Sequence, residues 1–317
     1  MVRVASIGVH ILDVLGRPVS EIPPGQNISL LDEIRVTVAG TAGGTAVDLA
    51  KLGAEVVSIG ATGDDEIGNV VRGILRRYGV DPSGMVEKKG VQTSATMLPI
   101  RPNGERPALH VMGANAQFSS ADVDFDSLSS FDVVHVGGTF LMPTFDGAQA
   151  ASVLEAAQAA GAITTMDVLG VNKPGLDETL RPSLPHLDYF MPNIEEAQMV
   201  TGLVDRAEIG QYFLDQGVGT VILKMGAEGS SIHRRGVPEV LVPAFRVDVV
   251  DTTGCGDAYD AGLIWALASG WDLHEAARLA SACGSLVATG LGSDAGIKDL
   301  ESTIAFMNSA PTLPTAV

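Results

Sequence analysis

The chain has 317 residues, 46% of them hydrophobic, and its 20 basic and 38 acidic residues give a net charge of −18 at pH 7. A chain of this size can bury a large core in one domain that carries an elaboration. The negative charge argues against nucleic acid or an anionic membrane as the main partner, and no apolar run reaches membrane-spanning length. Two cysteines, Cys255 and Cys283, fit neither a metal-site spacing nor a disulfide framework, which predicts a cytoplasmic protein.

The first third of the chain predicts a buried strand, two β insertions and a β-α-β unit. Residues 2–8 form a β-branched run that ends in glycine, as expected for a strand of a parallel sheet. Residues 14–39 contain the pair Pro23-Pro24 and then an alternating stretch at 31–38, which predicts an exposed strand pair. A helix at 45–52 and a strand at 55–60 follow, and then a helix around 70–77. A second exposed hairpin, 93–99 with 108–112, is expected about Asn103-Gly104.

From residue 132 onward strands and helices alternate regularly. Strands are expected at 133–136, 163–168, 189–191, 220–224, 230–233 and 240–242, and helices at about 147–160, 194–200, 206–214, 258–268, 273–289 and 298–307. This alternation predicts an α/β fold with a doubly wound, mainly parallel sheet flanked by helices. The expected division is a main domain of residues 1–13, 40–92 and 114–310, a small β-sheet lid of residues 14–39 and 93–113, and a loose tail at 311–317.

Residues 251–257, Asp-Thr-Thr-Gly-Cys-Gly-Asp, run from a glycine-punctuated loop into a helix. Gly254 and Gly256 let the backbone approach a ligand, and the first N–H groups of a helix have no partner inside it. An anion fits such a site. The carboxylate of Asp257 would repel that anion unless it had another task, and accepting a proton from an alcohol as general base is the natural one. The alternative is that Asp257 caps the helix and that the glycines form a tight turn.

The 251–257 segment resembles the second signature of the ribokinase-like carbohydrate kinases, the PfkB family, whose pattern is Asp-Thr-x-Gly-Ala-Gly-Asp. Only Cys255 departs from it, and cysteine is small like alanine. The resemblance spans nearly the whole chain and implies the ribokinase-like fold, with Asp257 as catalytic base and the amides of residues 254–257, namely Gly254, Cys255, Gly256 and Asp257, as an anion hole. It also implies that Asp251 and the Thr253 carbonyl hold a monovalent cation such as K⁺, as in some members.

Substrate-binding residues are expected after strands, because ligands of open α/β sheets bind at the carboxyl ends of the strands. Asp13 follows the first strand and can accept hydrogen bonds from two sugar hydroxyls, although a turn or cap carboxylate is the alternative. Residues 39–53 resemble the family's first signature, a glycine pair before a helix that ends in Ala-x-x-Leu-Gly, which implies that Gly40, Thr41 and Gly44 lie at the substrate. Most members carry asparagine where this chain has Gly44, so one side-chain contact to the sugar is missing or is supplied by another residue.

We expect different roles for two further stretches of the chain, one at the substrate and one in the structure. The second insertion carries His110, with Arg101 and Arg106 nearby, and it is expected to cover the substrate, which makes His110 and Arg101 candidate substrate contacts. Residues 60–68 match another family motif, and there we expect a structural role, with Asp65 as a helix cap.

The motif Asn-x-x-Glu of the family is matched by Asn193 and Glu196. One helical turn brings both side chains to the same side, where they can orient the water shell of a Mg²⁺ ion that bridges nucleotide phosphates. An ordinary helix cap with an acidic first turn is the alternative.

The nucleotide is expected beside the segment 224–229, which resembles the strand-to-turn segment next to the nucleotide in these kinases. Lys224, Gly226 and Gly229 are then nucleotide contacts, with Lys224 facing phosphate or forming a solvated strand end. The resemblance also places adenine between this turn and residues 282–290, where Ala282 and Ser285 would line a mostly apolar pocket. Thr253 completes this set of expected nucleotide contacts.

These expectations describe an ATP- and Mg²⁺-dependent sugar kinase that phosphorylates a hydroxyl of a sugar or sugar-like substrate. A nucleoside kinase of the adenosine type is one alternative, because this chain has Gly44 where most members of the family carry asparagine. A non-catalytic sugar-binding relative is the other, although the intact Asp257, Asn193 and Glu196 argue against it. The lid would exclude water that would otherwise hydrolyse ATP. Lids of this family often pair between subunits, which implies a homodimer. The sequence leaves the acceptor open.

Overall fold

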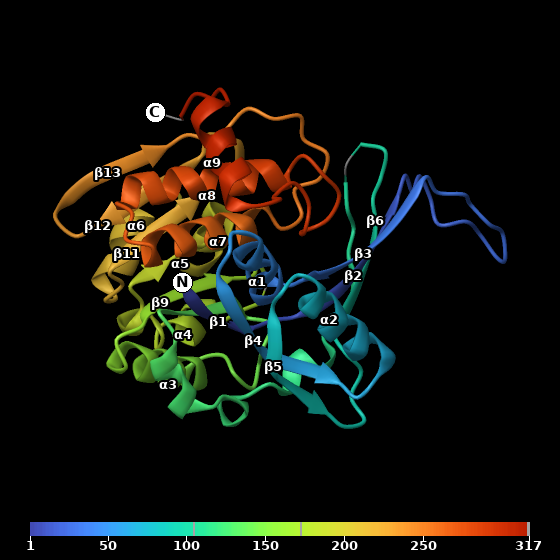
Figure 1. Cartoon of the computed structure of the whole chain (residues 1–317), viewed down its shortest axis with the longest axis horizontal. Helices are drawn as coiled ribbons and strands as arrows, with labels where there is room; N and C mark the ends of the chain where they lie inside the picture. The colour runs from blue at the N-terminus through green and yellow to red at the C-terminus, as the bar shows by residue number, and fades with distance from the viewer. Residues whose placement is uncertain (104, 172, 316–317) are drawn as a thin grey trace.

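The computed structural model describes residues 1–103, 105–171 and 173–315, and its larger β-sheet has nine strands (Figure 1). They are β1 (Arg3–Gly8), β4 (Glu55–Gly63), β5 (Asp81–Lys88), β8 (Val133–Thr139), β9 (Ile163–Val168), β10 (Tyr189–Phe190), β11 (Thr220–Lys224), β12 (Ser230–Arg234) and β13 (Val237–Val242). Their spatial order is β13-β12-β11-β10-β9-β8-β1-β4-β5. All pairs from β5 to β11 are parallel, and β12 and β13 extend the sheet in antiparallel fashion. The predicted mainly parallel sheet is confirmed.

Helices cover both faces of this sheet. On one face lie α1 (Thr41–Lys51), α2 (Glu66–Arg77), α7 (Cys255–Ala268), α8 (Leu273–Val287) and α9 (Leu300–Ser309), and on the other α3 (Ala148–Ala159), α4 (Leu176–Leu180), α5 (Ile194–Thr201) and α6 (Arg206–Asp215). Short 3₁₀ helices occupy Gly113–Gln117, Ser120–Asp122, Phe125–Ser130, Leu184–His186 and Gly226–Glu228. Alternate residues of a strand enter opposite cores: Val4 packs under the first group of helices, and Ala5 and Ile7 under the second.

The smaller sheet, here called the small sheet, has four strands and projects from the body of the molecule (Figure 1). It consists of β2 (Ile11–Arg17), β3 (Glu33–Ala39), β6 (Ala95–Pro99) and β7 (Leu109–Val111), in the order β3-β2-β6-β7. It is built from the two insertions that the sequence indicated. Asp13 is the third residue of β2, so it lies within the small sheet and not before it.

Several element boundaries differ from the expectations. β5 was not predicted, because Pro82 and Gly84 interrupt its strand pattern. Three helices begin earlier than expected, α1 at Thr41, α2 at Glu66 and α7 at Cys255. The predicted cap is confirmed, since the Asp65 side chain accepts a hydrogen bond from the Gly68 amide.

The prediction of a loose tail is wrong for residues 311–313. The Arg246 amide donates to the Pro311 carbonyl, and the Leu313 amide donates to the Ala244 carbonyl, both at 2.8 Å. Residues 316 and 317 of that tail, and Gly104 of the expected Asn103-Gly104 turn, lie outside the described residues. Among the helices that the structure describes, none combines the length and the apolar character needed to cross a membrane.

Candidate active site

A cleft of about 590 Å³ opens where β9 and β11 end and α7 begins, at the carboxyl edge of the large sheet. Many of the predicted site residues line it: Thr41, Asn193, Glu196, Lys224, Gly226, Gly229, Gly254, Cys255, Gly256, Asp257 and Ser285. Other predicted residues do not line it: Asp13, Gly40, Gly44, Arg101, His110, Asp251, Thr253 and Ala282. Residues predicted for catalysis and nucleotide binding therefore line the cleft more often than residues predicted for substrate binding.

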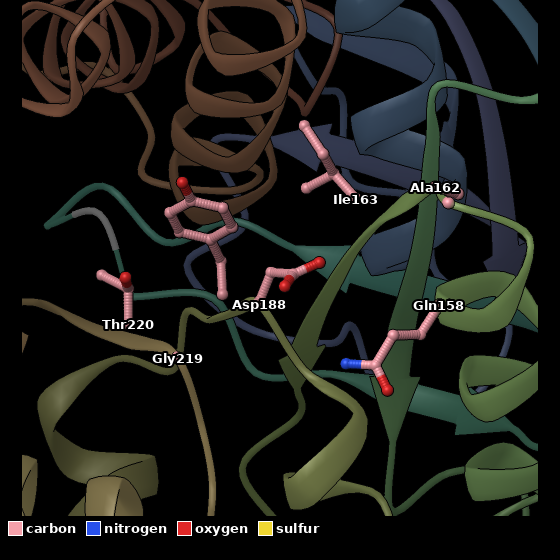
Figure 2. A pocket seen from close by; sticks show the side chains of 8 residues that line it. Gln158, Ala162, Ile163, Asp188, Gly219 and Thr220 are labelled. Carbon is pink, nitrogen blue, oxygen red and sulfur yellow. The ribbon is translucent and has the colours of Figure 1, made fainter.

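A second hollow, of about 480 Å³, lies at the opposite, amino-terminal ends of β9, β10 and β11 (Figure 2). It is lined by residues such as Gln158, Ile163, Asp188 and Thr220. The Asp188 carboxylate accepts hydrogen bonds from the amide and the hydroxyl of Thr164, which is a structural role. None of the predicted site residues borders this hollow, so we place the chemistry in the first cleft.

The N-terminus of α7 forms one wall of the cleft. Gly254 precedes the helix with φ 79°, a conformation that favours glycine. A Cβ atom there would lie 2.5 Å from the Ser293 Cβ, so a side chain would not fit. Cys255, Gly256 and Asp257 form the first turn of the helix and line the cleft, and the Cys255 amide donates to the Thr252 carbonyl at 3.4 Å. Burial raises the pKa of the Cys255 thiol to about 12, so this cysteine stays protonated and is no thiolate nucleophile at neutral pH.

The carboxyl group of Asp257 lies against α1. A Cβ atom on Gly44 would come within 2.5 Å of Asp257 Oδ2, so glycine at this position makes room for the carboxylate. The Thr45 hydroxyl donates to the Asp257 carbonyl at 3.3 Å and joins the same two helices. Gly44, where the resemblance led us to expect asparagine, therefore accommodates the acidic side chain.

Burial raises the pKa of Asp257 to about 7. The negative charge of Asp167 raises it further, and the ammonium group of Lys224 opposes the increase. A carboxyl group with a pKa near neutrality, at the end of a cleft, suits a general base.

Lys224, at the end of β11, is buried and held by two carboxyl groups. Its Nζ lies 2.9 Å from Asp167 Oδ2 and 3.1 Å from both oxygens of Asp260. Burial alone would lower the pKa of Lys224, but Asp167, Asp260 and Glu196 outweigh burial and raise it. The expectation of a solvated strand end is wrong for this residue. The Lys224 Nζ lies only 3.3 Å from the position that a Cβ atom on Gly256 would occupy. Lys224 therefore packs against the first turn of α7.

Asn193 and Glu196 form a reciprocal capping box at the start of α5. The Glu196 amide donates to Asn193 Oδ1 at 2.8 Å, and the Asn193 amide donates to Glu196 Oε2 at 2.9 Å. Glu196 Oε1 also accepts from the Gly170 amide at 3.0 Å. Burial and the nearby Asp167 raise the pKa of Glu196 to about 8. The helix-cap alternative is thus observed, and both side chains still line the cleft.

Asp251 is buried beside the cleft with its carboxylate already engaged. Oδ1 accepts from the amide and the hydroxyl of Thr253 at 3.0 and 2.8 Å, and Oδ2 accepts from the Gly292 amide at 2.9 Å. The Arg106 guanidinium, from the loop between β6 and β7, lies 3.6 Å from Oδ1 and donates to the Thr253 hydroxyl. Among the described residues, no group of three or more His, Cys, Asp or Glu side chains is arranged to hold a metal ion.

A polar row crosses the small sheet. Strand register places Asp13 beside Thr37 on β3 and Thr96 on β6, and Thr96 beside His110 on β7. The Thr96 hydroxyl and His110 Nδ1 are 3.1 Å apart. Burial raises the pKa of Asp13 to about 6, whereas Thr96 and the guanidinium of Arg106 lower it. Asp13 and His110 therefore lie in the same row, with Thr96 between them.

Arg101 is not part of this arrangement. Its exposed side chain lies 3.5 Å from Glu105, whereas Arg106 lines the cleft. Sequence reasoning noted both arginines on the insertion and chose the wrong one of them for the cleft. The hairpin loop has no periodic pattern from which the direction of either side chain could have been predicted.

On the nucleotide side, α8 presents Ser281 and Ser285 to the cleft, while Ala282 is fully buried in the core. The Ser285 hydroxyl accepts from the Phe245 amide at 3.2 Å, and the Ser281 hydroxyl donates to the Pro243 carbonyl at 2.7 Å. Residues 244–247, Val249 and Leu313 complete this wall, a contribution that the sequence did not suggest.

A doubly wound sheet, an acidic side chain at a glycine-rich helix N-terminus and a cleft between them define the class of α/β kinases that phosphorylate an alcohol group. Residues 1–300 match the model of the pfkB family carbohydrate kinases, and the chain belongs to that family. It is a phosphotransferase with an alcohol group as acceptor, and kinases of this family use ATP.

Three similar proteins illustrate the relationship. An ATP-dependent ribose-1-phosphate kinase of Halopiger xanaduensis is 30% identical over 292 residues, which cover 91% of this chain and 92% of that protein. The ribokinase of Haemophilus influenzae is 25% identical over 294 residues, with 90% and 92% covered. The structure of a putative ribokinase II from E. coli, in complex with ATP and Mg²⁺, has a TM-score of 0.83 at 22% identity and covers 97% of this chain and 99% of that one. The last of these shows the ribokinase-like fold.

Proposed function

We propose that this chain is an ATP-dependent sugar kinase, with Asp257 as general base and residues 254–257 as the anion hole. The observation that carries the proposal is the Asp257 carboxyl group, which lines the cleft in the first turn of α7 and has a pKa of about 7. Asp257 takes the proton of the acceptor hydroxyl while that oxygen bonds to the γ-phosphorus and the bond to the β–γ bridging oxygen breaks. The amides of the first turn stabilise the charge on the transferring group.

The residues of the cleft fit a Mg²⁺ ion bound with the nucleotide. Mg²⁺ keeps several waters, and Asn193, Glu196 and Asp167, whose oxygens already accept hydrogen bonds within the protein, would meet it through those waters along one side of the cleft. When bound, Mg²⁺ neutralises charge on the phosphates. A monovalent cation at Asp251 would have to share that carboxylate with three hydrogen bonds and with Arg106, so we do not propose one there.

For the acceptor we propose the polar row of the small sheet as the binding surface. Asp13 accepts hydrogen bonds from sugar hydroxyls, and the buried Thr37 hydroxyl beside it has no partner among the described residues. We propose that the small sheet acts as the lid, since Arg106 from its β6–β7 loop lines the cleft and donates to the Thr253 hydroxyl. Free cysteines at 255 and 283 accord with a cytoplasmic location.

The test is an ATP-consumption assay against a panel of ribose, fructose, ketodeoxysugars, nucleosides and ribose 1-phosphate. The last compound is included because the Halopiger relative is named for it. We expect turnover that depends on one acceptor and a phosphorylated product identified by mass spectrometry. Turnover on a nucleoside alone would favour the adenosine-type alternative. Bound sugar without any turnover across the panel would favour a non-catalytic binding protein.

We also propose a homodimer formed through the face of the small sheet opposite the polar row. Register aligns Val14, Val36, Met97 and Leu109 across the four strands on this face. Met97 is 58% and Leu109 54% exposed. A contiguous apolar row of this kind usually marks a protein contact, and a second copy offers a matching one.

Met97→Asp is expected to convert the dimer to a monomer, because a carboxylate buried opposite an apolar row is unfavourable. The measurement is sedimentation equilibrium at micromolar concentration. Val204→Asp, which changes an 81% exposed valine between α5 and α6, is the matched control and should remain dimeric. A monomeric wild-type protein, or a Met97→Asp variant of unchanged mass, contradicts the proposal.

A further inference from the structure

Residues 291–294, here called the junction segment, lie between the small sheet and the 251–257 segment. Leu291 packs into an apolar cluster whose other members all come from the small sheet or its β6–β7 loop: Leu15, Leu98 and Ile100. A Cβ atom on Gly292 would meet the Thr37 methyl group of β3 at 3.1 Å, and the Ser293 hydroxyl donates to the Val38 carbonyl at 3.0 Å. One side of the junction segment is thus fixed to the small sheet.

The other side of the junction segment contacts the 251–257 segment. The Gly292 amide donates to Asp251 Oδ2. Ser293 packs closely against Gly254, because a Cβ atom on Gly254 would lie only 2.5 Å from the Ser293 Cβ. Gly254 immediately precedes the first turn of α7. A shift of the junction segment would therefore move the backbone that carries the anion hole.

Asp294 fixes the junction segment in place. Its buried carboxylate lies 2.9 Å from an Arg35 guanidinium nitrogen on β3 and accepts a hydrogen bond from the Tyr78 hydroxyl at 2.5 Å. Its carbonyl oxygen accepts from Lys51 Nζ at 2.7 Å, and Lys51 in turn pairs with the buried Asp48 of α1. Arg35 belongs to the small sheet, whereas Lys51 and Tyr78 belong to the main body. Asp294 therefore joins the two parts at the point where the junction segment ends.

We propose that Asp294 is a positioning residue that couples the small sheet to the anion hole through the junction segment. Asp294 is not among the residues that line the cleft, and it acts through Ser293 and Gly254. When β3, the strand that carries Arg35, is in place, the first turn of α7 is held in the geometry that stabilises the transferring phosphoryl group. The inference rests on the proposed kinase function only for its kinetic consequences, because the contacts themselves are independent of substrate.

The test compares Asp294→Ala, Arg35→Ala and the double variant with wild type. We expect kcat to fall about 10- to 100-fold in Asp294→Ala, because a small displacement of a catalytic group costs that much, while KM for ATP changes little. The double variant should be no slower than the slower single variant, since both remove the same coupling. Hydrogen exchange of the amides at 251–257 should be faster in each variant, while exchange in β8 and β9 is unchanged.

Asp299→Ala is the matched control, because it removes a helix-capping carboxylate close in the chain but outside this cluster. It should lower stability without changing kcat or exchange at 251–257. Unchanged exchange at 251–257 in Asp294→Ala overturns the proposal, and so do additive kinetic effects. If wild type turns over no acceptor, the kinase function fails, and the exchange measurement still decides the coupling.

Discussion

The kcat/KM of the wild-type enzyme for its acceptor is expected to rise with pH through about 7 and to level off above it. The cause is Asp257, whose pKa burial and Asp167 raise to about 7, and which acts as a base only when ionised. Below pH 6 most of the enzyme holds a protonated Asp257 and the rate falls about tenfold per pH unit. A rate that is flat between pH 5.5 and 8.5 in the wild type is the contrary result.

Asp257→Asn is expected to lower kcat by about 10²- to 10⁴-fold and to remove this pH dependence, because asparagine cannot accept the proton. The folded pKa of Asp257 exceeds its value in an unfolded chain, so ionisation costs stability as pH rises from about 4 to 7. The variant should therefore be at least as resistant to urea as wild type at pH 8, which separates lost chemistry from lost folding. Asp272→Asn, at the exposed cap of α8, is the control and should keep full activity.

Most of the fold was predictable because hydrophobic periodicity is a local property. The β-branched runs of β1, β9 and β11 and the apolar stripes of α7 and α8 needed no tertiary information. β5 was missed because a parallel edge strand tolerates Pro82 and Gly84, which single-sequence reasoning takes as turn signals. The tail was missed because its order comes from pairing with residues 244–246, far away in the chain.

The site was predictable where its residues are consecutive and not where they meet across the fold. The glycines and aspartate of residues 251–257, together with the family signature that they match, predicted the segment that lines the cleft at the start of α7. The space for Asp257 depends on Gly44, 213 residues away, so the missing asparagine looked like a lost contact and not like room for the base. Lys224 likewise gave no local sign of its partners, since Asp167 and Asp260 are 57 and 36 residues distant.

Lys224, Asp167 and Asp260 form a buried charged cluster. Among these three side chains, the loss of Lys224 should cost the most stability. Two carboxyl groups and one ammonium are buried together, and burial raises the pKa of Asp260. Removing the only cation of the cluster leaves uncompensated negative charge in the core. Lys224→Met is therefore expected to lower the free energy of unfolding by about 3–5 kcal/mol at pH 8. Chemical denaturation followed by circular dichroism measures it.

The second variant separates charge from packing. Lys224→Met with Asp260→Asn removes one charge of each sign, and it should recover a large part of the lost stability. The deficit of Lys224→Met should also shrink as pH falls, because Asp260 then takes up a proton in place of the ammonium. Lys89→Met, in an exposed turn, is the control and should change stability by less than about 0.5 kcal/mol. A loss below 1 kcal/mol in Lys224→Met would show that the ammonium is not needed inside the fold, and a phosphate contact in the cleft would then be its main role.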